Sequence, residues 1–109
     1  MKVLVINKKW IEKFLSRKNV LDIRGTNTRI RGEIALSVGN TVVGFCTLAS
    51  VLSPEELKEL DSNHASDLSI SLLATYKYAN PHGWMLKNIR AVPPFVVNKP
   101  PKAVVWFDI

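Results

Sequence analysis

The chain has 109 residues, of which 47% are apolar and 22% are charged. This length and composition predict one folded domain spanning residues 1–109, and they argue against a disordered chain. One cysteine and two histidines argue against a disulfide framework or a zinc site of cysteine and histidine ligands, so we expect neither a metal nor a cofactor.

The first elements expected along the chain are two strands with a helix between them. Residues 2–6 (KVLVI) form a β-rich run, and Asn7 is placed to cap a helix over residues 8–17. The apolar side chains of that helix recur at helical spacing on one face. Residues 20–24 (VLDIR) alternate apolar and polar side chains, which predicts a half-buried strand.

A polar loop and a hairpin are expected next. Residues 25–32 are bounded by glycines and offer little to bury, which is typical of an exposed loop. Residues 33–38 and 41–51 are predicted to be strands. They are joined at Gly39-Asn40, a dipeptide typical of hairpin turns.

The third quarter of the chain contains one clear helix. Residues 53–56 (SPEE) form a capping box with proline at the first helical position, which predicts a short helix ending near Leu60. Residues 61–65 are expected to be a loop. Residues 66–76 are consistent with either a short helix or irregular structure, and residues 80–83 (NPHG) form a turn cluster.

The chain closes with two strands. Residues 84–92 are predicted to be a strand that the prolines at 93–94 interrupt or end, residues 99–102 a turn, and residues 103–107 (AVVWF) a final strand. About six strands with two or three short helices between them predict a mainly β, α+β fold. The expected architecture is a mainly antiparallel sheet closed into a small barrel.

The positive charge is concentrated in the first third of the chain. Fifteen basic against nine acidic side chains give a formal charge of +6, and residues 1–32 hold nine of the basic and two of the acidic ones. This asymmetry indicates a localised basic surface suited to a polyanion, and the alternative is a solvated helix face with scattered lysines. No apolar run approaches the ~18 residues of a membrane span and no signal-peptide pattern is found, so a cytoplasmic protein without a membrane partner is expected.

Three segments together resemble the ASCH domain family of the PUA-like superfamily. They are Trp10 in the first helix, residues 21–24 (LDIR), and residues 27–34 (NTRIRGEI). Residues 78–88 (YANPHGWMLKN), followed by two prolines, are similar to the closing half of that family. The likeness runs in order along nearly the whole chain. It implies a PUA-like small β-barrel and RNA, ahead of DNA, as the partner.

The chain departs from the motif Gly-x-Lys-x-x-Glu-x-Arg that is typical of the family. Aligned on Arg24, the motif places Asp22 at the acidic position, Asn19 at the lysine position and Arg17 at the glycine position. Lys18 is adjacent to the lysine position. In some relatives that lysine, with a nearby hydroxyl or acid, is implicated in amide or phosphodiester hydrolysis.

The resemblance therefore leaves an enzyme as the alternative function. This would be a small hydrolase acting on a modified nucleoside or on an RNA phosphodiester. Lys18 would activate the nucleophile or stabilise the oxyanion, and Asp22 would relay protons.

Five polar residues in or beside the glycine-bounded loop are the leading candidates for a ligand site: Arg24, Asn27, Thr28, Arg29 and Arg31. Arginine presents forked donors to phosphate, and the two neutral side chains add hydrogen bonds. The alternative for Arg24 is a structural ion pair with Asp22 or Glu33.

The other candidates also have both functional and structural interpretations. Asp22 orients Arg24 or Lys18, acts as a base, or is a solvated strand acid. Lys18 is a helix-end lysine or a catalytic or phosphate-binding one. Trp84 stacks on an extruded base or packs in the core. Arg17 is expected to contribute to phosphate binding at the same site, and the resemblance implies that Lys87 and Asn88 line it.

Cys46 lies in an alternating strand and is most simply a small buried apolar residue. A catalytic thiol needs a basic partner, and neither histidine has a recognised spacing to it. The sequence thus predicts a module that binds nucleic acid in a basic cleft between the first helix and the loop that follows Arg24. An interaction domain for an acidic peptide is a third interpretation.

Overall fold

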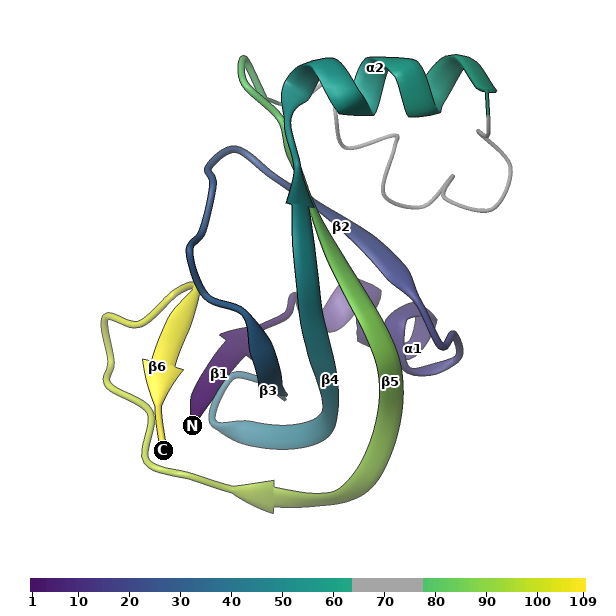
Figure 1. Cartoon of the computed structure of the whole chain (residues 1–109). Coiled ribbons are helices and arrows are strands. Elements are labelled where there is room, and N and C mark those ends of the chain that lie inside the picture. The colour runs from purple at the N-terminus through teal and green to yellow at the C-terminus, as the bar shows by residue number, and fades with distance from the viewer. Residues whose placement is uncertain (64–77) are drawn as a thin grey trace.

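The computed structural model describes residues 1–63 and 78–109 (Figure 1). Six strands and two helices occupy these residues: β1 (Lys2–Val5), α1 (Lys8–Leu15), β2 (Val20–Arg24), β3 (Gly32–Val38), β4 (Thr41–Leu52), α2 (Pro54–Asn63), β5 (His82–Val96) and β6 (Trp106–Asp108). Neither helix in these two ranges has the length and apolar character needed to cross a membrane.

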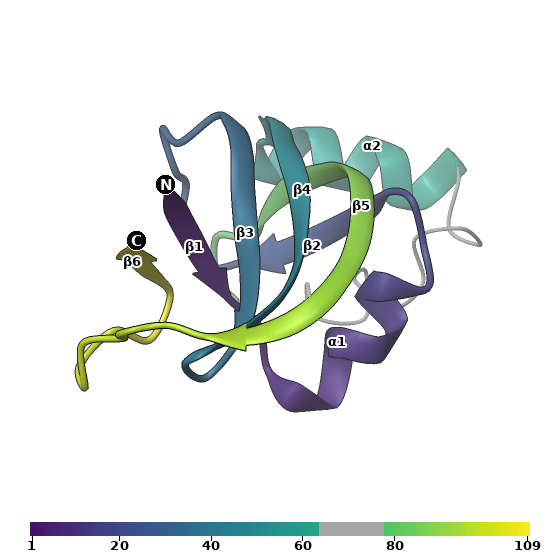
Figure 2. The same ribbon diagram turned by 90° about the horizontal axis from the view of Figure 1, so that it is seen from below.

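The strands form one curled sheet in the order β2-β5-β4-β3-β1-β6 (Figure 2). Neighbouring strands are antiparallel except for β1 and β3, which run parallel, so the predicted mainly antiparallel sheet is confirmed. The curl brings Trp106 of one edge strand onto Trp84, which lies next to the other edge. Their ring centroids are 5.7 Å apart and their planes differ by 17°. Side-chain stacking thus connects the two ends of the sheet.

The interior of the curl holds the main core, into which α1 projects Ile11 and Phe14. The helix lies close to β4 at Gly44. A Cβ at this glycine would lie 2.9 Å from the side chain of Leu15 and 2.8 Å from the backbone oxygen of Arg90. The absence of a side chain at this position therefore allows α1 to pack against the sheet.

The two predicted helix caps are confirmed. The Asn7 side chain accepts a hydrogen bond of 2.9 Å from the Lys9 amide at the start of α1. At the start of α2, the Glu56 amide donates to the Ser53 hydroxyl (3.2 Å), and the Ser53 amide donates to the Glu56 carboxylate (3.0 Å). Each contact satisfies an amide that the first helical turn leaves without a backbone partner.

Both helices end at residues that differ from the predicted ones. The first stops at Leu15 and not at residue 17, because the Arg17 amide bonds to the Phe14 carbonyl, which tightens the last turn. The second continues through Asn63, so the loop predicted for residues 61–65 is wrong over its first three residues. That stretch contains neither glycine nor proline to stop a helix. The ambiguous segment over residues 66–76 lies outside the described residues.

The last two strands also differ from the prediction. The fifth strand passes through its two prolines because the pairing with β4 bulges there. Val42 pairs with Phe95 but Gly44 pairs with Ala91, so three residues of β5 face one of β4 and need no ladder hydrogen bond. The sixth strand begins only at Trp106, and residues 103–105 precede it without strand structure.

Candidate functional site

β2 carries Asp22, an acidic residue that is buried. Leu21 and Ile23 pack against Leu57 of α2 on one face of this strand. Alternation turns Asp22 and Arg24 to the opposite face, toward the interior of the curl. The Asp22 side chain is only 12% exposed, so the interpretation as a solvated strand acid is wrong.

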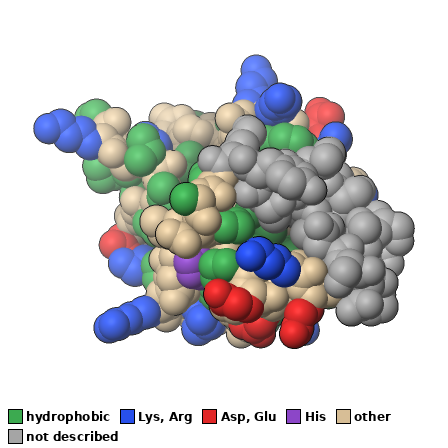
Figure 3. All heavy atoms as spheres, turned by 90° about the horizontal axis from the view of Figure 1, so that it is seen from above, with side chains coloured by type: hydrophobic (Ala, Val, Ile, Leu, Met, Phe, Trp, Pro, Cys, Tyr) green, Lys and Arg blue, Asp and Glu red, His purple; other side chains and the backbone are tan. Residues whose placement is uncertain are grey.

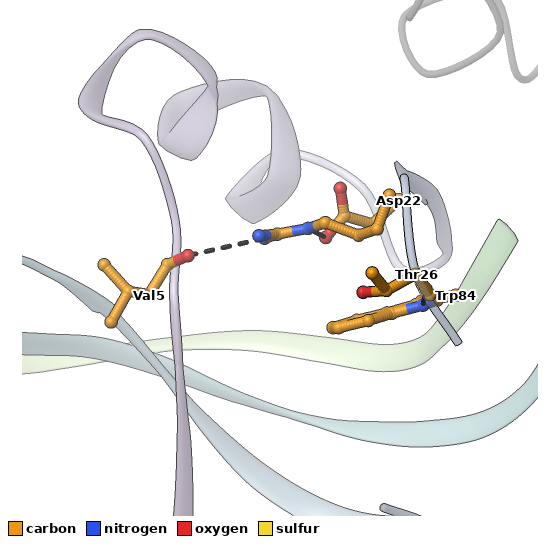
Figure 4. A network of polar contacts seen from close by, with 5 residues as sticks. Val5, Asp22, Thr26 and Trp84 are labelled. Atoms are coloured by element: carbon orange, nitrogen blue, oxygen red, sulfur yellow. Dashed lines mark hydrogen bonds and ion pairs between the residues drawn. The ribbon is translucent and has the colours of Figure 1, made fainter. Parts of the chain in front are cut away.

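Arg24 connects β2 with β1 and β5 in the network of polar contacts shown in Figure 4. Its Nε donates to the Asp22 carboxylate at 2.8 Å, and its Nη2 donates to the carbonyl oxygen of Val5 at the end of β1, at 3.3 Å. Its Cζ lies 5.3 Å from the ring centroid of Trp84 in β5. The Trp84 indole N–H in turn donates to the Thr26 carbonyl oxygen at 2.9 Å, which fixes the loop that follows β2. The structural ion pair predicted as the alternative for Arg24 is therefore present.

Burial dominates the electrostatics of this pair. Desolvation raises the pKa of the Asp22 carboxyl above its ordinary value of 3.8, and the charge and hydrogen bond of Arg24 lower it only in part. The carboxyl consequently holds its proton to higher pH than an exposed aspartate does.

Trp84 packs in the core. It is 1% exposed and already stacks on Trp106, so its ring offers no free face to an extruded base in this structure. Of the two interpretations of Trp84, the structure shows packing in the core. The polar contribution of Trp84 is the hydrogen bond that anchors the loop after β2.

The loop over residues 25–31 is shaped by its own polar groups. The Asn27 side chain accepts from the Thr28 amide at 2.8 Å, and the Thr28 hydroxyl accepts from the Ile30 amide at 3.2 Å. Arg31 folds back, and its Nη1 donates to the carbonyl oxygens of Thr28 and Ile30 at 2.8 Å each. Arg29 is exposed and makes no ion pair with a carboxylate in residues 1–63 and 78–109.

A second group of predicted residues lies at the other end of β2. Lys18 is exposed, and its carbonyl oxygen accepts from the Ile89 amide at 2.8 Å. The Asn19 side chain accepts from the amide of Asn88 at 3.3 Å, and Asn88 has a left-handed backbone (φ 55°). Lys87 is exposed beside it, and Arg17 is partly buried at the end of α1.

The structure therefore divides the predicted site into two ends. Asp22 pairs with Trp84 in the β-ladder, whereas Lys18 bonds Ile89, five residues further along β5 and about 16 Å along the strand. Lys18 is exposed and Asp22 is buried, so the two groups assigned to hydrolysis are not brought together. Their catalytic roles stay predictions.

Tyr78 is the residue near this site to which the sequence analysis gave no role. Its ring lies against Gly25, where an added Cβ would be 2.7 Å from the ring atom Cδ1, and the residue is 38% exposed. An aromatic residue just before a proline-containing turn was the available signal. Within the described ranges, no group of three histidine, cysteine or acidic side chains could hold a metal ion.

No protein-family model matches the chain, and no curated protein matches it in sequence. Solved structures do match it, among them those of a protein from Zymomonas mobilis. The crystal structure of ASCH from Zymomonas mobilis superposes with a TM-score of 0.69 at 15% identity, covering 98% of this chain and 87% of that chain.

Two substituted forms of the same protein, called ZmASCH, give the same result. A tyrosine-to-phenylalanine mutant has a TM-score of 0.71 at 14% identity, covering 98% of this chain and 89% of that chain. A serine-to-alanine mutant has a TM-score of 0.71 at 15% identity, with 98% and 87% covered. Coverage of nearly the whole chain in the same arrangement confirms the α+β architecture expected from the resemblance. The chain has the fold of the ASCH domain, which is a PUA-like fold.

Proposed function

We propose that the chain binds nucleic acid, RNA ahead of DNA, through exposed cations of α1 and of the loop over residues 25–31. We call this set the basic surface: Lys8, Lys9, Lys13, Arg29 and Arg31. Both parts flank Arg24. The helix begins three residues after Val5, to which Arg24 bonds, and the loop begins directly after Arg24. The preference for RNA is what the resemblance to PUA-like domains implies.

The observation that carries this proposal is that the basic surface is not neutralised. Among the described residues, Lys2 pairs with Asp108, Arg24 with Asp22 and Arg90 with Glu33. No member of the basic surface makes an ion pair with a described carboxylate. The Nζ atoms of two α1 lysines lie instead 5.5 and 5.2 Å from the ring centroid of Trp10. Uncompensated surface cations of this kind attract phosphate and release its counterions.

Helix energetics do not account for the two lysines at the start of α1. Lys8 and Lys9 lie in the first turn, where the helix dipole favours negative charge, and that turn has no acidic residue. The first turn of α2 has Glu55 and Glu56, which suit its dipole. A polyanionic partner accounts for charges that are unfavourable for the helix itself.

Acidic side chains gather elsewhere on the molecule. Three glutamates of α2 are exposed: Glu55, Glu56 and Glu59. Figure 3 shows several acidic side chains close together at one edge of the face seen from above. In both ribbon views α1 and α2 are well separated (Figures 1 and 2). This division of charge orients a polyanion toward α1 and away from α2.

The experiment is a binding titration with a fluorescent 12-nucleotide RNA at several potassium chloride concentrations, with a DNA of the same sequence in parallel. We expect the affinity to fall with salt. The double variant Lys9→Gln/Lys13→Gln should make the slope of log K against log salt shallower by about 1.4, or ~0.7 for each lost phosphate contact.

Lys2→Gln is the matched control, because Lys2 is also an exposed lysine but already pairs with Asp108 at the outer edge strand. It should leave the slope unchanged. An affinity that ignores salt, or no binding at low salt, contradicts the proposed function. Equal affinity for the RNA and the DNA contradicts the preference for RNA.

A further inference from the structure

We infer that Tyr78 and the loop over residues 25–31 form a stacking site for an unpaired nucleobase, so that the nucleic acid bound is single-stranded at this point. The inference rests on the proposed function, to which it adds the class of ligand. It assigns to Tyr78 the stacking role that the sequence analysis considered for Trp84.

The Tyr78 ring lies against Gly25, and part of the residue is open to solvent. It contacts the backbone at Gly25, the first residue after β2, yet 38% of the residue remains exposed. A rigid aromatic ring with part of its surface in water is the platform on which unpaired bases stack in proteins that bind single strands.

Gly25 supplies the space that the ring occupies. An added Cβ would lie 2.7 Å from Cδ1 of Tyr78 and 3.3 Å from Cε1. The backbone of Gly25 is not in the left-handed region, unlike that of Gly32 (φ 95°) and Gly39 (φ 57°). The missing side chain is therefore needed for contact with the ring and not for a special backbone conformation.

The surroundings of the ring suit a nucleotide. The loop that begins at Gly25 exposes the amide of Asn27 and the guanidinium of Arg29, which are groups that bind base edges and phosphate. The buried indole of Trp84 holds the Thr26 carbonyl, and Arg31 holds two further loop carbonyls. The loop is thus organised by the protein before any ligand binds, which lowers the entropic cost of binding.

The test compares Tyr78→Ala with Phe95→Ala. Phe95 is the matched control because it is similarly exposed, at 41%, but lies near the far end of β5. Each variant is titrated with single-stranded RNA, with duplex RNA and with inorganic polyphosphate, which has charge but no bases. We expect Tyr78→Ala to weaken binding of single-stranded RNA by about 5- to 150-fold. Polyphosphate binding should be unchanged, and Phe95→Ala should match the wild type throughout.

Two further variants separate stacking from local packing. Tyr78→Phe keeps the ring and should retain the affinity for single-stranded RNA. Gly25→Ala keeps the tyrosine but displaces it, and should weaken binding in the same direction as Tyr78→Ala. Thermal unfolding of each variant checks that the fold is intact.

The outcomes distinguish the two proposals. Failure of the wild type to bind either RNA or polyphosphate at low salt overturns both. Binding of both ligands by the wild type, with Tyr78→Ala indistinguishable from Phe95→Ala, overturns the stacking site and leaves the proposed function standing. An equal loss on RNA and on polyphosphate also overturns the stacking site, because polyphosphate has no base to stack.

Discussion

Arg24 and the lysines of α1 come from the same basic third of the chain, yet they lie in opposite environments. The Arg24 side chain is 20% exposed, pairs with Asp22, and lies over the ring of Trp84. Lys9 and Lys13 are exposed and make no ion pair with a described carboxylate, and their Nζ atoms lie near the ring of Trp10. One region uses its cation inside the protein, and the other presents its cations to solvent.

The difference shows that the position of the nearest acid, rather than the number of cations, decides what a cation does. Asp22 and Arg24 are two residues apart on one strand, so alternation places both side chains on the same face. The single acid of α1, Glu12, makes no ion pair with a described residue. A charge count over residues 1–32 does not distinguish Arg24 from the lysines of α1. The ion pairing within each element does distinguish them.

The largest expected effect is on the reactivity of the Cys46 thiol, which reports whether the interior that contains Arg24 is closed to solvent. Cys46 is fully buried in the same core cluster as Trp84. Burial, with a smaller contribution from Glu33, raises the pKa of its thiol from about 9.0 to about 12. Three pKa units mean ~1000-fold less thiolate near pH 8, so we expect alkylation by iodoacetamide to be slower by at least that factor than for a free thiol.

Mass spectrometry of the native and the urea-unfolded chain measures this rate. Rapid labelling only after unfolding supports a closed interior. Native labelling at the rate of the unfolded chain would mean that the interior opens to reagent. The contrast between the Arg24 region and the exposed lysines would then be lost.

The next effect is on stability and arises from the buried pair. Asp22→Ala removes the carboxylate that accepts from Arg24 Nε and leaves a half-buried guanidinium without it. We expect the free energy of unfolding, measured in urea, to fall by about 2–4 kcal/mol. The salt slope of RNA binding by the folded variant should stay that of the wild type, because Arg24 is not part of the basic surface.

Asp22→Asn is the matched control, since its amide oxygen still accepts from Arg24, and it should lose far less stability than Asp22→Ala. Because burial raises the pKa of Asp22, the folded chain holds this proton to higher pH than the unfolded chain does. The stability contributed by the neutral carboxyl is present below pH 3.8 and is lost as pH rises through the folded pKa. The wild type should therefore lose stability relative to Asp22→Asn over that range. A gap that is constant with pH would contradict the assigned cause.

Local sequence patterns were sufficient to predict much of the fold. The Asn7 cap, the capping box at Ser53 and the hairpin at Gly39-Asn40 depend on residues close together in the chain, and the structure contains all three. The boundaries of β2 agree with the prediction for the same reason. These features follow from steric and hydrogen-bonding preferences that act within a few residues.

The site was harder to predict because it is built from contacts between distant segments. Trp84 reaches Thr26 across 58 positions of the chain, and the Tyr78 ring lies on Gly25 across a similar separation. Alternation within β2 correctly set Asp22 on the face opposite Leu21. It could not show that the curl of the sheet buries that face as well. Which aromatic ring is buried and which is open follows from the closed sheet and not from either local sequence.

The smallest expected effect is on the free energy of unfolding when charges in the first turns of the two helices are reversed. Lys8→Glu replaces an exposed cation that opposes the dipole of α1, so we expect the free energy of unfolding to rise by about 0.3–1 kcal/mol at low salt. Glu55→Lys makes the opposite change at the start of α2 and should lower it by a similar amount. RNA binding should respond independently of stability. Lys8→Glu should make the salt slope shallower by about 0.7 or more, and Glu55→Lys should not reduce the affinity.

The pair of substitutions is informative because stability and binding are expected to change in opposite directions at Lys8. A general loss of structure would lower both quantities, and a cation with only a structural role would lower stability without changing the salt slope. Urea unfolding and RNA titration on the same preparations separate these cases. If Lys8→Glu stabilises the chain and also binds RNA as the wild type does, Lys8 is not a phosphate contact. The basic surface would then begin at Lys9 and include the loop arginines, and α1 would contribute one charge fewer than proposed.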